Sequence, residues 1–171
     1  MSHLLELLSG APHEIATFIL AMLPISELRG AIPYGITIGG MSWQKTFAIA
    51  VAGNALPVVP ILYLIGPVSD WLRRFPVFDR FFTWIFARTR RKGEMIQRLE
   101  AVGLMLFVAV PLPVTGAWTG SLAAFLFGLR KPLAIPAILL GVLLAGVIVT
   151  LATQGMIGAW GLFTVSPEPA G

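Results

Sequence analysis

The stretch LPISELRGAIP, residues 23–33, places a carboxylate and a guanidinium two residues apart, between two prolines, inside an otherwise uncharged run. From residue 15 to residue 69 the only charged side chains are Glu27, Arg29 and Lys45. A charge near the middle of a bilayer costs roughly 2.5–3.5 kcal/mol on insertion scales, so such residues usually face a cavity or a partner. The prolines and glycine disfavour one straight helix, and irregular backbone at membrane depth needs surrounding protein or water. The stretch therefore predicts the tip of a re-entrant hairpin that carries a functional site.

The overall composition places the chain in a membrane. Of its 171 residues 57% are hydrophobic and 12% charged, and the mean hydropathy is +0.86. This is too apolar for a soluble domain and long enough for one membrane domain, residues 1–171. The chain has no cysteine, its two histidines lie at the edge (His3 and His13), and no nucleophile–base or metal motif appears. We therefore expect no enzymatic activity, no metal and no cofactor.

The uncharged runs 15–26 and 30–44 flank the charged stretch. As helices they reach roughly 18–22 Å, and neither crosses a hydrocarbon core about 30 Å thick. We expect them to be the arms of a first hairpin; the alternative is a single tilted span broken at Pro24. Residues 46–66 are predicted to form a full span, kinked at Pro57 and Pro60. Asn54 in this span is a candidate polar contact, either to a freed carbonyl or between helices.

The second half of the chain has the same order of elements. Residues 103–129 are uncharged, but their middle, VPLPVTGAWTGS at residues 110–121, is rich in proline, glycine and polar donors. This pattern predicts a second hairpin. Residues 132–153 are predicted to form a second span, and residues 154–171 to fray.

The segment between the halves, residues 67–100, is basic. From residue 70 to residue 100 it holds eight Lys or Arg residues and four acids, interleaved with aromatic residues in its first part. We expect amphipathic helices on the membrane surface with lipid headgroups as partners; the plainer alternative is a solvated cytoplasmic loop. Long apolar runs on both sides disfavour nucleic-acid binding.

A shift of 89 residues superposes the two halves. Over the 52 positions from 15 to 66 it gives nine identities, among them Pro24 on Pro113. We expect a repeat of about 14–66 and about 103–155.

The basic residues of 70–100 and 130–131 place these segments on the cytoplasmic side of the membrane and both termini on the outer side, with Lys45 as the exception. The two hairpins then enter from opposite sides, so the fold expected is all-α, an inverted repeat in which the hairpin turns meet near the midplane. The residues expected at these turns are Pro24, Ser26, Gly30, Pro33, Pro111, Pro113, Thr115, Gly116, Trp118, Thr119 and Gly120.

Three segments carry a resemblance to a known family. Residues 24–35 (PISELRGAIPYG), 53–57 (GNALP) and 111–120 (PLPVTGAWTG) resemble the small multi-drug export protein family of prokaryotic membrane proteins. That family is distantly similar to the DedA (VTT-domain) superfamily, which the resemblance links to paired re-entrant hairpins, lipid translocation and proton-coupled processes. Glu27 matches the acidic residue of the first hairpin. The DedA arginine motif lies in the second hairpin, where this chain has Trp118 and Thr119.

These observations lead to one functional expectation. We expect a multi-pass transporter of the inner (cytoplasmic) membrane that moves small cationic or amphiphilic molecules, with Glu27 and Arg29 coupling transport to protons. The alternatives are a DedA-like lipid scramblase or flippase, and a membrane scaffold in which Glu27 and Arg29 form a structural pair. Two spans are few for a transport path, which favours a homodimer.

Overall fold

The computed structural model describes residues 11–76, 79–80, 83, 94–112 and 115–164, and their regular structure is helical. This confirms the all-α prediction. The helices are α2 (His13–Met22), α3 (Glu27–Pro33), the π-helical turn η1 (Tyr34–Ile38), α4 (Trp43–Ala55), α5 (Val58–Leu72), α7 (Glu94–Ala109), α8 (Ala117–Leu126) and α9 (Lys131–Thr164).

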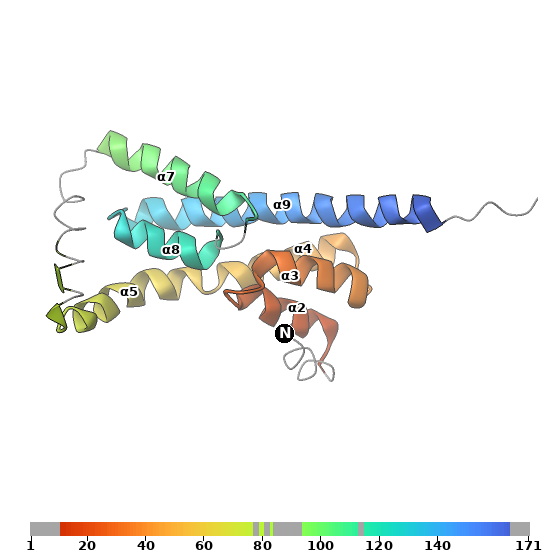
Figure 1. Cartoon of the computed structure of the whole chain (residues 1–171), viewed down its shortest axis with the longest axis horizontal. Helices are drawn as coiled ribbons and strands as arrows, with labels where there is room; N and C mark the ends of the chain where they lie inside the picture. Colours follow the sequence, from red (N-terminus) through yellow and green to blue (C-terminus); the bar gives the residue numbers. More distant parts are fainter. Residues whose placement is uncertain (1–10, 77–78, 81–82, 84–93, 113–114, 165–171) are drawn as a thin grey trace, which may run out of the picture.

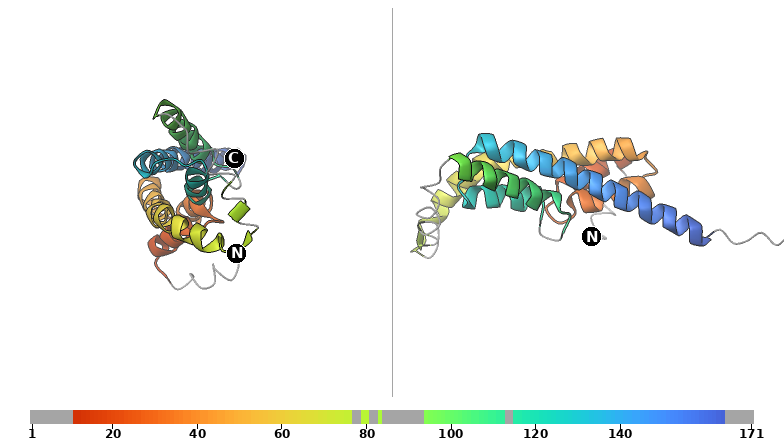
Figure 2. Two further views of the ribbon diagram at one scale, coloured as in Figure 1. Left: turned by 90° about the vertical axis from the view of Figure 1, so that its left-hand side faces the viewer. Right: turned by 90° about the horizontal axis from the view of Figure 1, so that it is seen from above.

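Two long rods form the frame of the molecule. Figure 1 shows that α4 and α5 follow one another along the long axis and that α9 runs the opposite way. The pair α2–α3 covers one half of this frame and the pair α7–α8 the other half (Figures 1 and 2). Helix α2 packs on α4 and α7 packs on α9, while α3 contacts α9 and α8 contacts α5. Each helix pair therefore contacts both rods.

Within each helix pair, the turn that joins the two helices lies near the centre of the molecule. We call the link between α2 and α3 turn A (residues 23–26) and the link between α7 and α8 turn B (residues 110–116). In Figure 1 the chain reaches turn A from one end of the long axis and turn B from the other. This arrangement brings two segments almost ninety residues apart into contact.

Among the described residues, two helical stretches are long and apolar enough to cross a membrane, by length and composition: Trp43–Leu72, which comprises α4 and α5, and Lys131–Trp160 of α9. The inward face of α9 is buried, for example at Ile138 and Val142, whereas its outward face exposes large apolar residues. These outward residues are Leu140, Leu143, Leu144, Val147, Ile148 and Leu151. A continuous apolar exterior of this kind is typical of a membrane-contacting surface.

Turn A is shorter than the sequence predicts. Helix α2 ends at Met22 and α3 begins at Glu27, so Glu27 and Arg29 belong to the first helical turn of α3, not to an irregular elbow. Pro33 does not lie at turn A either; it is the last residue of α3, where the missing N–H and the ring disrupt regular α-helical bonding. The helix continues there as the wider π-helical turn η1. Gly40, with φ of 61°, then ends this arm.

The predicted break in the first rod is confirmed at Pro57 and is wrong at Pro60. Helix α4 ends at Ala55 and α5 begins at Val58. Pro60 is the third residue of α5, and an amide in the first turn of a helix needs no intrahelical acceptor, so a proline is tolerated there.

The predicted boundaries on both sides of the charged segment 67–100 were wrong. Helix α5 continues past Gly66 to Leu72, and α7 begins at Glu94, so both enter the predicted surface segment 67–100. Long charged side chains can direct their heads to water while their stems stay on an apolar surface, so they need not end a helix. Of the segment 67–100 predicted to form amphipathic surface helices, residues 77–78, 81–82 and 84–93 lie outside the described residues.

The second rod is longer than predicted. Residues 154–164, which were expected to fray, continue α9 to a length of 34 residues, or about 51 Å. They contain no proline, so nothing in this stretch removes a backbone donor.

Candidate functional site

Each turn is closed by its own hydroxyl group. In turn A, Ser26 Oγ donates a hydrogen bond to the carbonyl of Leu20. In turn B, Thr115 Oγ1 donates to the carbonyl of Val110 over 2.6 Å and accepts from the Leu112 amide over 3.1 Å. The shift of 89 residues places Ser26 on Thr115. The predicted turn residues Ser26 and Thr115 therefore hold the backbone of the two turns from equivalent positions.

Glu27 reaches from α3 to the start of α8. It is the only residue other than glycine with positive φ in the described part of the chain, at 45°, and only 4% of it is exposed. Its carboxylate accepts a hydrogen bond from the backbone amide of Trp118, in the first turn of α8. It also lies so close to Gly116 that a Cβ there would overlap the carboxylate. The amino end of a helix favours negative charge, so α8 stabilises an ionised Glu27.

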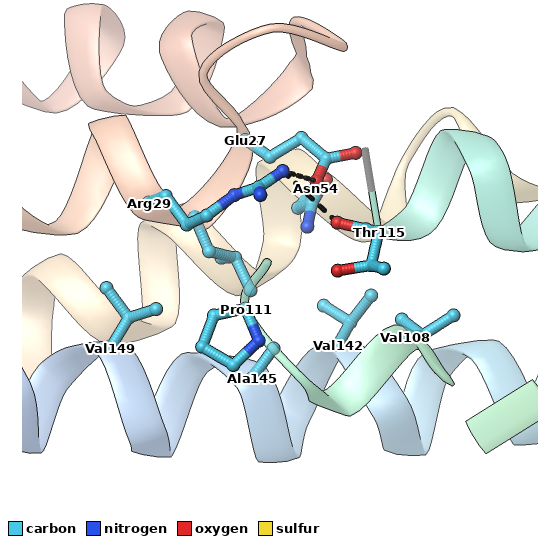
Figure 3. Close-up of a pocket in the computed structure, with 11 residues that line it drawn as sticks. Glu27, Arg29, Asn54, Val108, Pro111, Thr115, Val142, Ala145 and Val149 are labelled. Carbon is cyan, nitrogen blue, oxygen red and sulfur yellow. Dashed lines mark hydrogen bonds and ion pairs between the residues drawn. The ribbon is translucent and has the colours of Figure 1, made fainter. Parts of the chain in front are cut away.

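Arg29 joins the carboxylate to turn B. Its Nη2 lies 3.3 Å from Glu27 Oε2 and donates to the carbonyl of Thr115 over 3.1 Å (Figure 3). Its Nη1 donates to the carbonyl of Leu112. Side chains two positions apart diverge on a regular helix. Glu27 and Arg29 nevertheless form an ion pair here, at the very start of α3, where the backbone of Glu27 is left-handed and not regular helix. One guanidinium thus binds a carboxylate from its own helix and two carbonyls from the other helix pair.

Trp118 makes the reverse connection, from α8 to the end of α2, next to turn A. Its Nε1 donates a 2.9 Å hydrogen bond to the carbonyl of Met22, the last residue of α2. The shift of 89 residues places Arg29 on Trp118 and Glu27 on Gly116. The equivalent residues Arg29 and Trp118 therefore each bind a backbone carbonyl of the opposite helix pair. The Glu27 carboxylate lies against Gly116, the residue equivalent to Glu27 in the second half, which has no side chain.

Trp118→Phe is expected to weaken this connection without disturbing Glu27, because phenylalanine keeps a ring but has no donor for the Met22 carbonyl. A typical hydrogen bond contributes about 0.5–1.5 kcal/mol to the free energy of unfolding. Denaturant unfolding in detergent measures the change. Trp43→Phe is the control, since that side chain is 47% exposed at the start of α4; an equal loss in both variants would contradict the connection.

A small cavity lies beside the ion pair. Its lining includes Glu27, Arg29, Asn54, Thr115 and Gly116. Its volume is about 10 Å³ for the centres of water-sized spheres. Figure 3 shows Asn54 entering from α4, next to Glu27 and Arg29, with Val142, Ala145 and Val149 of α9 below. Pro111 also lines the cavity, so the structure joins the predicted pair, the polar residue of the first rod and turn B.

The other predicted turn residues have structural surroundings. Pro24 is exposed, and a Cβ on Gly30 would lie 2.8 Å from Ser26 Cβ. Thr119 Oγ1 donates to the carbonyl of Gly116, the residue just before α8, over 3.4 Å. Gly120 packs against Val108. Pro113 lies outside the described residues.

Sequence reasoning missed the backbone groups of the site. The carbonyls of Met22, Leu112 and Thr115 accept the three side-chain donors that cross between the helix pairs. The signal available was indirect: Pro111 has no N–H and interrupts helical bonding, which leaves carbonyls nearby without helical partners.

Chemically, the site holds one carboxylate that can take up a proton and one fixed guanidinium. Within the part of the chain that the structure describes, no three His, Cys, Asp or Glu residues come together as metal ligands. The site is therefore an ion pair that can take up a proton, and it lies between turns A and B.

Comparisons with known proteins identify the family. A protein-family model described as "Putative small multi-drug export protein" matches residues 27–148, which include Glu27, Arg29, Asn54 and turn B. None of the curated proteins and none of the solved structures compared with the chain matches it, and the similarity to DedA is not shown. The family match and the two apolar helices indicate a membrane protein. Because the match spans most of the chain, the protein belongs to the family of small multi-drug export proteins.

Proposed function

We propose that the protein exports small cationic or amphiphilic molecules across the inner membrane and that Glu27 couples this export to protons. The family description supports export of small molecules. The observation that carries the coupling is the buried Glu27 carboxylate, held between turns A and B by Arg29 and by the start of α8. An ionisable residue inside a membrane segment is by default a functional-site hypothesis.

The arrangement of helices supports two re-entrant hairpins in an inverted repeat. Helix α2 has 10 residues, about 15 Å, and α8 has the same length, so neither crosses the hydrocarbon core. Their turns meet near the centre of the molecule, and the two pairs approach from opposite ends (Figure 1). Broken helices that meet at the interface of inverted repeats are a recurring site architecture in secondary transporters.

The predicted orientation, with both termini outside, has one exception among the basic residues. Lys45 at the start of α4 forms an ion pair with Glu14 over 2.7 Å. The hydrogen bond from Lys45 lowers the pKa of Glu14, so the pair stays ionised at neutral pH and its charges cancel. The orientation rule counts Lys and Arg residues and not net charge, so Lys45 stays the one exception, although its charge is compensated by Glu14.

Proton uptake by Glu27 supplies a physical means of coupling. An ionised carboxylate attracts Arg29 and the amino end of α8, and both attractions weaken when the carboxyl group is neutral. Arg29 keeps its bonds to the carbonyls of Leu112 and Thr115. Protonation thus releases one contact between the helix pairs and leaves the others, which allows one pair to move against the other.

Transport in proteoliposomes tests the function. The purified protein is reconstituted and supplied either with a fluorescent cationic dye or with a labelled lipid, each with and without a pH gradient. We expect dye movement that depends on the gradient. Movement of lipid alone would favour the scramblase alternative, and movement of neither would favour the scaffold.

Cysteine labelling tests the hairpins, because the chain has no cysteine of its own. Single cysteines are introduced at four exposed positions: Pro12, Ser42, Arg98 and Arg130. We expect positions 12 and 42 to react from one side of the membrane and positions 98 and 130 from the other. Reaction from opposite sides within either pair would turn that hairpin into a full span.

A further inference from the structure

Asn54 has a buried acceptor that the protein does not satisfy. The residue lies near the end of α4, just before the break at Pro57, and is 2% exposed. No described group donates a hydrogen bond to its Oδ1. Buried polar atoms are nearly always paired with protein or with ordered water. An unpaired amide oxygen at this depth therefore points to a bound molecule.

The cavity beside Asn54 has the size and polarity for one water molecule. A water needs roughly 10–15 Å³ by this measure of volume, together with two to four polar partners. The cavity measures about 10 Å³ and is lined by the polar residues Asn54, Glu27 and Thr115, with Val108 and Val142 on the apolar side. It is too small for a drug-sized ligand, which needs roughly 300 Å³ or more.

The charges of the site favour a neutral occupant. Glu27 is compensated by Arg29 at 3.3 Å, so the pair carries no net charge. A metal cation would add an uncompensated charge deep in the protein, which is unfavourable. Asn54 Oδ1 and the carboxylate are both acceptors, so the occupant must donate two hydrogen bonds. Water meets both conditions.

We propose that one water molecule occupies this cavity, donates one hydrogen bond to Asn54 Oδ1 and one to the Glu27 carboxylate, and passes protons to Glu27. The proton-passing role rests on the proposed function. In this step the water gains a proton on its oxygen from the solvent side, which forms one O–H bond, as one of its own O–H bonds breaks and a Glu27 O–H bond forms. The occupant is then again a neutral water, and the net change is one proton moved from solvent to Glu27. Asn54 acts through the water as a positioning residue.

The experiment uses infrared spectroscopy on the full chain in lipid, with H₂¹⁶O exchanged for H₂¹⁸O. We expect a band of one confined water that shifts with the isotope in the wild type and is lost in Asn54→Leu, which has similar volume but no acceptor. The carboxyl band of Glu27 should also respond to a pH jump more slowly in Asn54→Leu. Thr46→Val is the matched control, because Thr46 is buried on the same helix, its hydroxyl has no described partner, and it does not line the cavity. It should keep the band and the wild-type rate.

Two results would overturn the proposal: no isotope-sensitive band in the wild type, or a band that persists unchanged in Asn54→Leu. If Asn54→Leu does not fold, a high-resolution structure of the wild type decides instead. It should show water within hydrogen-bond distance of Asn54 Oδ1 and the Glu27 carboxylate, and an empty cavity would refute the site. Neither measurement depends on transport, so an inactive wild type with the water present would contradict only the proposed function.

Discussion

Gly116→Ala is expected to abolish transport and to lower stability strongly, because a Cβ at residue 116 would overlap the Glu27 carboxylate. The carboxylate would have to leave the start of α8 and its place beside Arg29. Separating a buried ion pair typically costs about 3–5 kcal/mol, since the remaining charge is uncompensated. Denaturant unfolding in detergent and dye transport in proteoliposomes measure the two losses.

The control is to introduce Gly116→Ala into proteins that already carry a substitution at Glu27. In a Glu27→Ala protein the new Cβ meets no carboxylate, so adding Gly116→Ala should change stability little. In a Glu27→Gln protein the side chain has nearly the same size, so the loss from steric overlap should remain, whereas the loss from separating the ion pair should not. Gly103→Ala is a control at a glycine inside α7 with open space at its Cβ, and this substitution should be neutral or stabilising by up to about 1 kcal/mol. An equal loss in all three Glu27 backgrounds would show that the contact with Glu27 is not what requires Gly116.

The second large effect separates Glu27 from Arg29. Glu27→Gln should abolish proton-coupled transport in a folded protein, because glutamine keeps the volume and can still accept from the Trp118 amide. Arg29→Gln should be the less stable variant, because it removes the donors to Leu112 and Thr115 and leaves a buried carboxylate uncompensated, at a cost of about 3–5 kcal/mol. Arg29→Lys keeps the charge but loses the planar fork, so we expect an intermediate stability.

The double variant distinguishes function from structure. If the pair were only structural, Glu27→Gln combined with Arg29→Gln would recover stability and transport together, because no charge remains unpaired. We expect stability to recover in part and transport to stay absent. Full recovery of transport in the double variant would remove Glu27 as the coupling residue.

Much of the helix order could be predicted because prolines and glycines act locally. Pro24 and Pro57 lie at breaks in the structure, and Gly128, with φ of 65°, follows the second helix pair as Gly40 follows the first. The shift of 89 residues places α3 and the first rod on α8 and α9 with offsets of a few residues, whereas α7 begins eight residues before the shifted start of α2. Helix ends in the charged region were harder, because a charged residue limits burial in lipid and not helix formation.

The site could be predicted only in part, because its partners are largely backbone. Glu27 and Arg29 are conspicuous as charges in an apolar run, and Asn54 as a polar residue in a span. The carbonyls that bind Arg29 and Trp118 carry no residue-specific signal, since every residue has one. The contact between Glu27 and Gly116 depends on the left-handed backbone at Glu27 and on how closely α3 approaches α8, and both are tertiary features.

Whether Glu27 carries the coupled proton is tested most directly by dye uptake driven by a pH gradient, measured side by side for the wild type and Glu27→Gln in proteoliposomes. Both proteins should reconstitute as folded chains with the same far-UV circular dichroism. We predict that the gradient accelerates dye movement in the wild type and has no effect in Glu27→Gln. Gradient-driven uptake that is equal in the two proteins would contradict the role of Glu27.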